Sequence, residues 1–210
     1  MVNPTPSQSL RALVCGAAIS CLLLFSGCQI QQPVRVDASF NTAPALATRG
    51  PSDIAVLPIE DGTKDHAVER HLTFLRQEVM RQLPDRLFTP LRSEIVDASL
   101  RSEAAPIGES MLTPATLQRI AGRVREDALL AIRVDTWDES SLMTNRRVKF
   151  ALQAALVGSD GQQLWSGSLK GDVKAGGAGA APLGRDSAAR SCAELAVREL
   201  LLNLPRRTIQ

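Results

Sequence analysis

Three segments in which apolar and polar residues alternate follow one another between residues 128 and 173. In the first, ALLAIRVDTW, apolar side chains recur at every second position from Leu130 to Val134. The second, RVKFALQAALV, repeats this pattern from Val148 to Leu156, and LWSGSLKGDV follows after the turn sequence GSDGQQ. A period of two predicts β-strands with one buried face, and short connections predict antiparallel neighbours. The chain is therefore predicted to contain an antiparallel meander.

Strand and helix patterns alternate before this meander. IAVLPI, which begins at Ile54, is a short apolar run bounded by turn residues, as is typical of a buried strand. Apolar residues then recur at helical spacing between residues 65 and 82, and RLFTPL has the pattern of a second strand. Two more helices are predicted at 92–101 and 113–127.

A Gly- and Ala-rich connection, KAGGAGAAPLG, leads to a last predicted helix at about 186–203. The predicted order is β-α-β-α-α-β-β-β-α. Helices followed by a run of antiparallel strands indicate an α+β fold, a sandwich of a mixed sheet and helices. The predicted domain spans 53–205, and 206–210 form a tail.

An apolar run, ALVCGAAISCLLLFSG, precedes Cys28 near the start of the chain. Its length suits a signal peptide and falls short of the roughly 20 residues that a membrane-spanning helix needs. We therefore expect residues 1–27 to be a signal peptide; the alternative is an uncleaved helix. The stretch Phe-Ser-Gly-Cys resembles the lipobox of bacterial lipoproteins. That resemblance implies that Cys28 becomes the acylated, palmitate-bearing first residue and binds the membrane, since several acyl chains anchor stably.

Residues 28–52 are rich in Gln, Ala and Pro and show no sustained period. They are predicted to form a flexible tether from the lipidated Cys28. The alternative is that residues 34–40, VRVDASF, add an edge strand to the sheet. Lipidation and cleavage leave Cys192 as the one free thiol, so the domain needs a hydrophobic core of its own.

Charge and aromatic content exclude some classes of partner. The chain has 24 Lys and Arg against 22 Asp and Glu, which gives no reason to expect nucleic-acid binding. Aromatic residues make up 3% of the chain and Tyr is absent, which argues against a stacking platform for bases or sugars. The expected partners are the membrane, through the lipid on Cys28, and a protein of the cell envelope.

Three stretches resemble a family of bacterial envelope proteins: IAVLPIEDGT, IAGRVREDALLAIRV and AALVGSDGQQLWSGS. The family opens with a hydrophobic-Ala-Val-Leu-Pro strand, continues through an Ala-Asp-Ala helix-to-strand junction, and ends with a Leu-Trp-x-Gly hairpin. Glu126-Asp127-Ala128 departs from the junction motif. The family includes the amino-terminal domain of TolB, the curli-secretion lipoprotein and the lipoprotein activators of penicillin-binding proteins. The resemblance implies an α+β domain that serves envelope assembly, secretion or transport, with Trp165 in the core.

Patterns that could carry catalysis or bind a metal are weak. His66 and His71 flank Glu69 without the spacing of a metal site, and solvated helix residues are the simpler interpretation. Ser110 lacks the Gly-x-Ser-x-Gly frame, and Cys192 is expected to be a small buried residue. Acidic residues at the end of the first meander strand are expected to form a polar hairpin tip: Asp135, Asp138 and Glu139. We therefore expect no enzyme activity, metal or cofactor; the alternative is a hydrolase without a recognisable motif.

A docking role directs attention to aromatic and Arg residues, which concentrate interface energy. Trp137 lies out of phase with Leu130 and Val134, so it is expected to point away from the buried face. Arg146 and Arg147 lie across the predicted hairpin, and the three residues form the predicted partner-binding patch. The competing interpretation is that Trp137 packs under the helices.

The residue after Cys28 is Gln29, whereas the usual inner-membrane signal of lipoproteins is an aspartate. By this resemblance the protein is expected at the periplasmic face of the outer membrane. The predicted function is a non-enzymatic docking or accessory module of the envelope. An alternative, from a more distant resemblance, is an auxiliary lipoprotein of a lipid-transporting ABC system.

Overall fold

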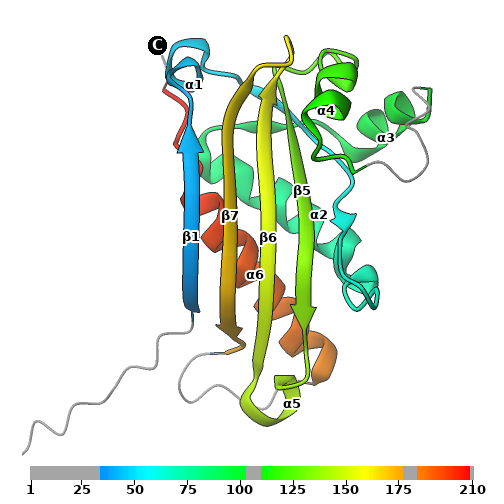
Figure 1. Cartoon of the computed structure of the whole chain (residues 1–210), viewed down its shortest axis with the longest axis vertical. Helices are drawn as coiled ribbons and strands as arrows, with labels where there is room; N and C mark the ends of the chain where they lie inside the picture. Colours follow the sequence, from blue (N-terminus) through cyan, green and yellow to red (C-terminus); the bar gives the residue numbers. More distant parts are fainter. Residues whose placement is uncertain (1–33, 103–109, 177–183, 209–210) are drawn as a thin grey trace, which may run out of the picture. The chain divides into compact units, whose positions relative to one another are not determined.

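The computed structural model describes residues 34–102, 110–176 and 184–208. Its centre is one mixed sheet in the order β1-β7-β6-β5-β2-β4, with β3 paired to β5 (Figure 1). Strands β2 and β3 run parallel to β5, and β4 runs parallel to β2, while β1, β7, β6 and β5 are antiparallel. The strands are β1 (Val34–Thr42), β2 (Asp53–Val56), β3 (Glu60–Asp61), β4 (Thr89–Pro90), β5 (Ala128–Asp138), β6 (Arg147–Gly158) and β7 (Gln163–Lys174). The predicted meander is confirmed.

Six α-helices are present in the described part of the chain: α1 (Pro44–Arg49), α2 (Leu72–Gln82), α3 (Ser93–Ser102), α4 (Pro114–Ile120), α5 (Leu142–Asn145) and α6 (Arg185–Leu202). The 3-10 helices η1 (Glu69–His71) and η2 (Leu83–Arg86) flank α2. Helices α2 and α6 cover one face of the sheet (Figure 1), so the predicted α+β class is confirmed. Among these helices, none has the length and apolar character to cross a bilayer.

The main core lies between the sheet and helices α2 and α6. Alternate residues of β6, from Val148 to Leu156, face these helices and are nearly inaccessible to solvent. Helix α6 contributes small side chains here, Ala189, Cys192 and Ala196, which let the helix approach the sheet closely. A smaller cluster under α3 and α4 covers the opposite face over β2, the first half of β5 and the end of β6.

Helix α4 ends earlier than predicted. It covers residues 114–120, whereas the helical pattern extended to 127. Gly122 and Arg125 have positive φ angles and turn the chain toward β5. The carboxylate of Asp127 then accepts hydrogen bonds from the amides of Ser52 (2.8 Å) and Asp53 (3.0 Å), which joins the start of β5 to the start of β2. The junction motif found in the sequence therefore has a structural role.

Residues 34–49 are not the flexible tether that the composition of this segment predicted. Residues 34–42 pair along their whole length with β7, and residues 44–49 form α1. The alternative, an edge strand, is what the structure contains. Two glycines of β7 let β1 pack closely against it. A β-carbon added at Gly167 would overlap the ring of Phe40, and one added at Gly171 would overlap the backbone of Arg35. Phe40 stacks on Trp165 with 5.6 Å between ring centroids.

The end of the chain also packs on the domain. Within the predicted tail, the amide of Arg207 donates to the carbonyl oxygen of Arg86, and its Nε donates to that of Gly50, each at 3.0 Å. The domain therefore begins earlier and continues further than the predicted 53–205.

Replacing Gly171 by alanine is expected to loosen β1. The new methyl group would overlap the Arg35 carbonyl oxygen and lie 2.8 Å from the Val36 Cα, both of them backbone atoms that cannot rotate away. Overpacking of this kind costs about 2 kcal/mol. The substitution should increase the rate of amide hydrogen exchange more in β1 than in β6. The control is Gly184→Ala, where no atom lies within 4 Å of the added carbon; unchanged exchange in β1 would contradict the prediction.

Candidate docking surface

Within residues 34–102, 110–176 and 184–208, no helix packs on the sheet face opposite α2 and α6 over β1, β7, the second half of β5 and the part of β6 before Ala155 (Figure 1). We call this surface the open face. Strand alternation and the register define its members. They are Arg35, Asp37, Ser39 and Asn41 on β1; Ser166, Ser168, Lys170, Asp172 and Lys174 on β7; Arg147, Lys149, Ala151 and Gln153 on β6; and Arg133, Asp135, Thr136 and Asp138 on β5.

Charged side chains occupy the half of the open face near the start of β1. The register places Arg35, Asp172, Lys149 and Asp138 side by side on four neighbouring strands, with alternating sign. Directly opposed residues on a sheet stabilise each other when their charges are opposite. Asp172 forms an ion pair with Arg147, and the Ser140 amide lowers the pKa of Asp138 by a hydrogen bond to its carboxylate. The charges of this half therefore alternate in sign from strand to strand.

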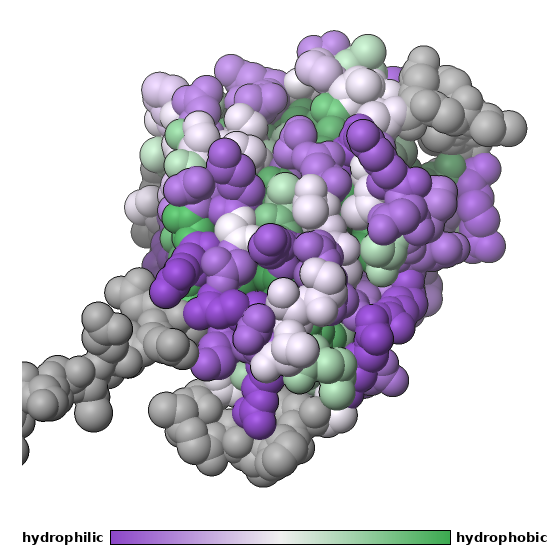
Figure 2. All heavy atoms as spheres, turned by 60° about the horizontal axis from the view of Figure 1, so that its bottom comes forward, coloured by the Kyte–Doolittle hydropathy of each residue, from purple (hydrophilic) through white to green (hydrophobic). Residues whose placement is uncertain are grey.

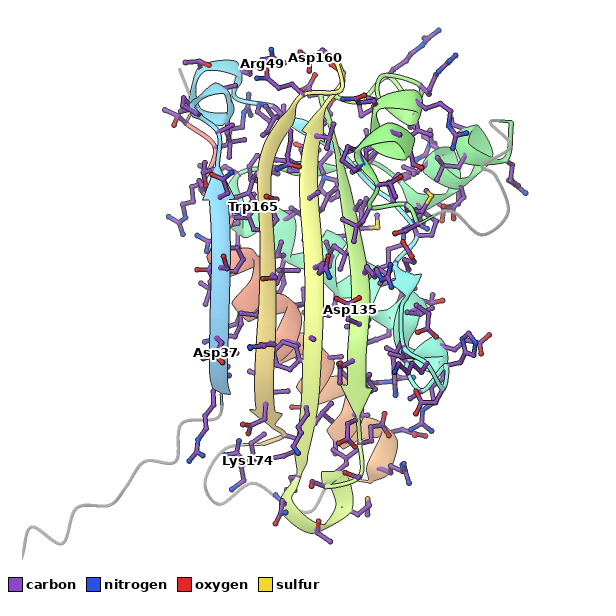
Figure 3. The ribbon with its side chains drawn as sticks, viewed as in Figure 1. Asp37, Arg49, Asp135, Asp160, Trp165 and Lys174 are labelled. Atoms are coloured by element: carbon purple, nitrogen blue, oxygen red, sulfur yellow. The ribbon has the colours of Figure 1, made fainter. Side chains whose placement is uncertain are left out.

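In the other half, small or neutral side chains gather on β1, β7 and β6, beside Arg133 and Asp135 of β5. Ser39, Ser168 and Gln153 form one row across β1, β7 and β6, and the Gln153 amide donates to Asp135 Oδ2 at 2.6 Å. Two shallow grooves of about 340 and 380 Å³ run over these rows, and Figure 3 labels Asp37 and Asp135, which line the second. Because the backbone groups of β6 and β7 are paired within the sheet, the polar groups offered here are those of the side chains. This half of the open face can therefore accept side chains of a partner surface.

Trp137 does not belong to an exposed patch. It lies in the main core with 3% of its surface exposed, and its Nε1 donates to Glu139 Oε1 at 2.9 Å. The ring also contacts the imidazole of His71, with 5.6 Å between centroids. The predicted role of Trp137 as an exposed anchor is therefore wrong, and the competing interpretation is correct.

A β-bulge in β5 explains why the alternation of apolar and polar residues predicted the wrong face for Trp137. Leu130, Ile132 and Val134 face the helices, and a strict period of two would turn Trp137 to the other face. The register against β6 shifts between Val134 and Thr136, so that Asp135 is an extra residue. One inserted residue exchanges the two faces of a strand for every position after it. Trp137 consequently faces the helices.

The two arginines of the predicted patch lie on different surfaces from Trp137. Arg147 belongs to the open face and pairs with Asp172. Arg146 has a positive φ of 55° after α5, and its carbonyl oxygen accepts a hydrogen bond from Ala175 at 2.8 Å. The structure does not bring the three predicted residues together as one surface.

Glu139 is the centre of a polar cluster that the sequence did not indicate. Its side chain is 7% exposed, and it accepts hydrogen bonds from Trp137, from His71 Nε2 at 2.6 Å, from Arg70 and from Arg185 at 3.3 Å. These donors come from β5, η1 and α6. The carboxylate therefore ties together three elements at one end of the domain.

Burial by itself raises the pKa of the Glu139 carboxyl. Hydrogen bonds from Trp137 and His71, together with the positive charge of Arg70, outweigh this effect and hold the pKa below its ordinary value. A carboxylate whose lone pairs are all engaged is a structural centre rather than a proton-transfer group. Asp138 and Glu139 lie in the polar β5–β6 hairpin that was predicted, but the Glu139 side chain is buried in this cluster.

The other candidates for chemistry are structural in the described part of the chain. His66 is exposed and contacts Asp61 at 3.3 Å, whereas His71 is buried, so the expectation of a solvated side chain is wrong for His71. Among the described residues, no group of His, Cys, Asp and Glu could hold a metal ion. The Ser110 hydroxyl donates to Glu60 at 2.7 Å. Cys192 is fully buried, as expected, and this burial raises the pKa of its thiol to about 11. Cys28 lies outside the described residues.

No family model matches the sequence, and no curated relative is similar to it in sequence. Some solved structures are similar. Lipoprotein GNA1162 from Neisseria meningitidis is 20% identical, with 73% of this chain and 98% of that chain covered and a TM-score of 0.44. The PelC dodecamer from Paraburkholderia phytofirmans is 14% identical, with 84% and 100% covered and a TM-score of 0.46. The LpoB C-terminal domain from Salmonella enterica is 19% identical, with 59% and 83% covered and a TM-score of 0.41. These similar structures include a lipoprotein.

Proposed function

We propose that the protein is a lipid-anchored, non-enzymatic module of the bacterial envelope that binds a partner protein on its open face. The observation that carries this proposal is a sheet face, four strands wide, that the described helices leave largely uncovered. An antiparallel sheet can be solvated on one side, so an uncovered face is not sufficient alone. The composition of this face supplies the further support.

A purely solvated face would be expected to carry long charged side chains throughout. On the open face, Ala151, Ser166 and Ser168 stand on the two central strands, and Gln153 beside them is held by Asp135. Ordered small residues lose little side-chain entropy when a partner binds.

A partner-binding test uses two substitutions that fill the grooves. Gln153→Arg with Ser168→Arg should reduce by at least tenfold the envelope protein recovered with this chain from crosslinked cells. The matched control is Gln77→Arg with Thr73→Arg, two exposed positions on α2 at the opposite side of the sheet. Equal recovery of the same protein with both variants would contradict docking on the open face.

Anchoring rests on the lipobox-like sequence that ends at Cys28. Cys28→Ser should abolish palmitate labelling and leave the precursor uncut, because the thiol is the group that is acylated. Sucrose-gradient fractionation should place the native protein with outer-membrane markers, as Gln29 implies. A mutant that is still cut and membrane-bound would exclude the lipid anchor, and co-migration with inner-membrane markers would exclude the outer membrane.

A further inference from the structure

We propose that one end of the domain docks on the anionic surface of the membrane that holds the lipid on Cys28, so that the domain stands upright with its open face directed sideways. This inference rests on the anchor proposed above. We call this end the basal end; it comprises residues 34–37, 138–149, 170–174 and 185–188. These segments are the start of β1, the β5–β6 hairpin, the end of β7 and the first turn of α6.

The length of chain before β1 sets the distance to the membrane. Only five residues, Gln29 to Pro33, separate Cys28 from Val34, the first residue of β1. Even fully extended, this connection spans at most about 20 Å. Because residues 34–42 belong to the sheet, the predicted tether of 25 residues is reduced to a link of five residues. Such a link keeps the domain close to the membrane that holds the lipid. The basal end, where β1 begins, is held next to the lipid surface.

Charge at the basal end suits an anionic surface. It carries seven basic residues: Arg35, Arg146, Arg147, Lys149, Lys170, Lys174 and Arg185. Five acidic residues accompany them: Asp37, Asp138, Glu139, Asp172 and Asp186. Two of the five are engaged by arginines, since Glu139 is buried against Arg70 and Arg185 and Asp172 pairs with Arg147. Figure 3 labels Lys174 and Asp37 at this end.

The electrostatic attraction of the basal end to an anionic leaflet is strong enough to orient the domain. An anionic leaflet attracts each basic residue at its surface strongly enough that an excess of two charges favours one orientation by about 30-fold. The lipid already supplies attachment, so this preference needs only to orient an anchored domain. Figure 2 shows the basal end turned forward, with hydrophilic residues over much of its described surface. Met143 at the hairpin tip is 62% exposed and is the apolar side chain placed to enter the headgroup layer.

A fluorophore at the hairpin tip tests the orientation. In the full processed chain Cys28 is blocked by lipid and Cys192 is buried, so Met143→Cys provides one reactive thiol. The labelled protein is placed on vesicles of phosphatidylcholine alone or with 30% phosphatidylglycerol, and quenching by acrylamide is measured. On the anionic vesicles quenching at position 143 should fall at least threefold. Leu202→Cys is the control, since it is 52% exposed near the end of α6, far along the helix from the basal end.

Variants that remove basic residues test whether charge causes the protection from quenching at position 143. Arg35→Gln with Lys149→Gln should restore full quenching at position 143, because it removes the excess of two charges. Arg119→Gln with Arg123→Gln, exposed positions near α4, should not. Equal quenching on both kinds of vesicle, or protection at 202 instead of 143, would overturn the inference while leaving the anchor intact. A chain that floats with neither kind of vesicle would contradict the anchor and this inference together.

Discussion

Replacing Trp137 by alanine is expected to lower the free energy of unfolding by about 4 kcal/mol. The indole is 3% exposed and fills the space between β5 and the start of α2, beside the imidazole of His71. Truncation leaves a cavity that the surrounding strands cannot close, since Phe150 and Val148 are held by their own pairing. It also removes the Nε1 hydrogen bond to Glu139. Urea unfolding of the soluble domain measures the loss.

Met143→Ala is the matched control on the same hairpin. Its side chain is 62% exposed, so the free energy of unfolding should change by less than about 0.5 kcal/mol. A similarly small change for Trp137→Ala would contradict the buried position. It would instead support the exposed anchor that the alternation predicted.

Replacing Glu139 by glutamine is expected to lower the free energy of unfolding by about 2 kcal/mol, because a neutral amide accepts hydrogen bonds from the buried Trp137 and His71 side chains more weakly than a carboxylate does. Arg70 and Arg185 both pair with this carboxylate, and His71 donates to it at 2.6 Å. Glutamine keeps the size of the side chain but has one acceptor oxygen and no charge. Thermal or urea unfolding measures the loss, and Glu94→Gln on the exposed surface of α3 serves as the control.

The same carboxylate makes stability depend on pH. The pKa of Glu139 is lower in the folded protein than its ordinary value of 4.5. A carboxyl with a lowered pKa stabilises the fold above the ordinary pKa, and this contribution is lost as the pH falls through the lowered value. The native chain should therefore lose stability below about pH 4.5. Glu139→Gln should show a weaker loss over that range; an identical acid profile would contradict the role of this group.

The sequence predicted the order of strands and helices from Ile54 to α6 because each element has its own local period. Strand pairing in the meander followed from the short turns between alternating segments, and the register confirms it. Trp165, expected in the core from the family resemblance, is buried.

The edge strand could not be assigned from its own residues. VRVDASF alternates only briefly. The two glycines that allow this segment to pack against β7 lie more than a hundred residues later in the sequence. The tether was a reasonable interpretation of composition alone. The strand also bears on the proposed membrane docking, because only five residues separate Cys28 from the start of β1.

The candidate site was less accessible to sequence analysis than the fold. A bulge at Asp135 inserts one residue and leaves no mark in the composition, so the face of Trp137 was inverted. Glu139 looked like a hairpin-tip residue because its partners, His71 and Arg185, lie far away in sequence. The polar residues that alternate with the apolar ones on β6 and β7, such as Lys149, Gln153 and Lys170, were the local signal of a polar face.

The most direct test of docking on the open face is photocrosslinking in living cells from single positions. A photoreactive phenylalanine analogue at Gln153 or Ser168 should link the protein to one envelope partner. The same analogue at Gln77, exposed on α2 at the other side of the sheet, should not. Crosslinks to that partner from Gln77, with none from Gln153 or Ser168, would contradict the account and move the docking surface to the helices.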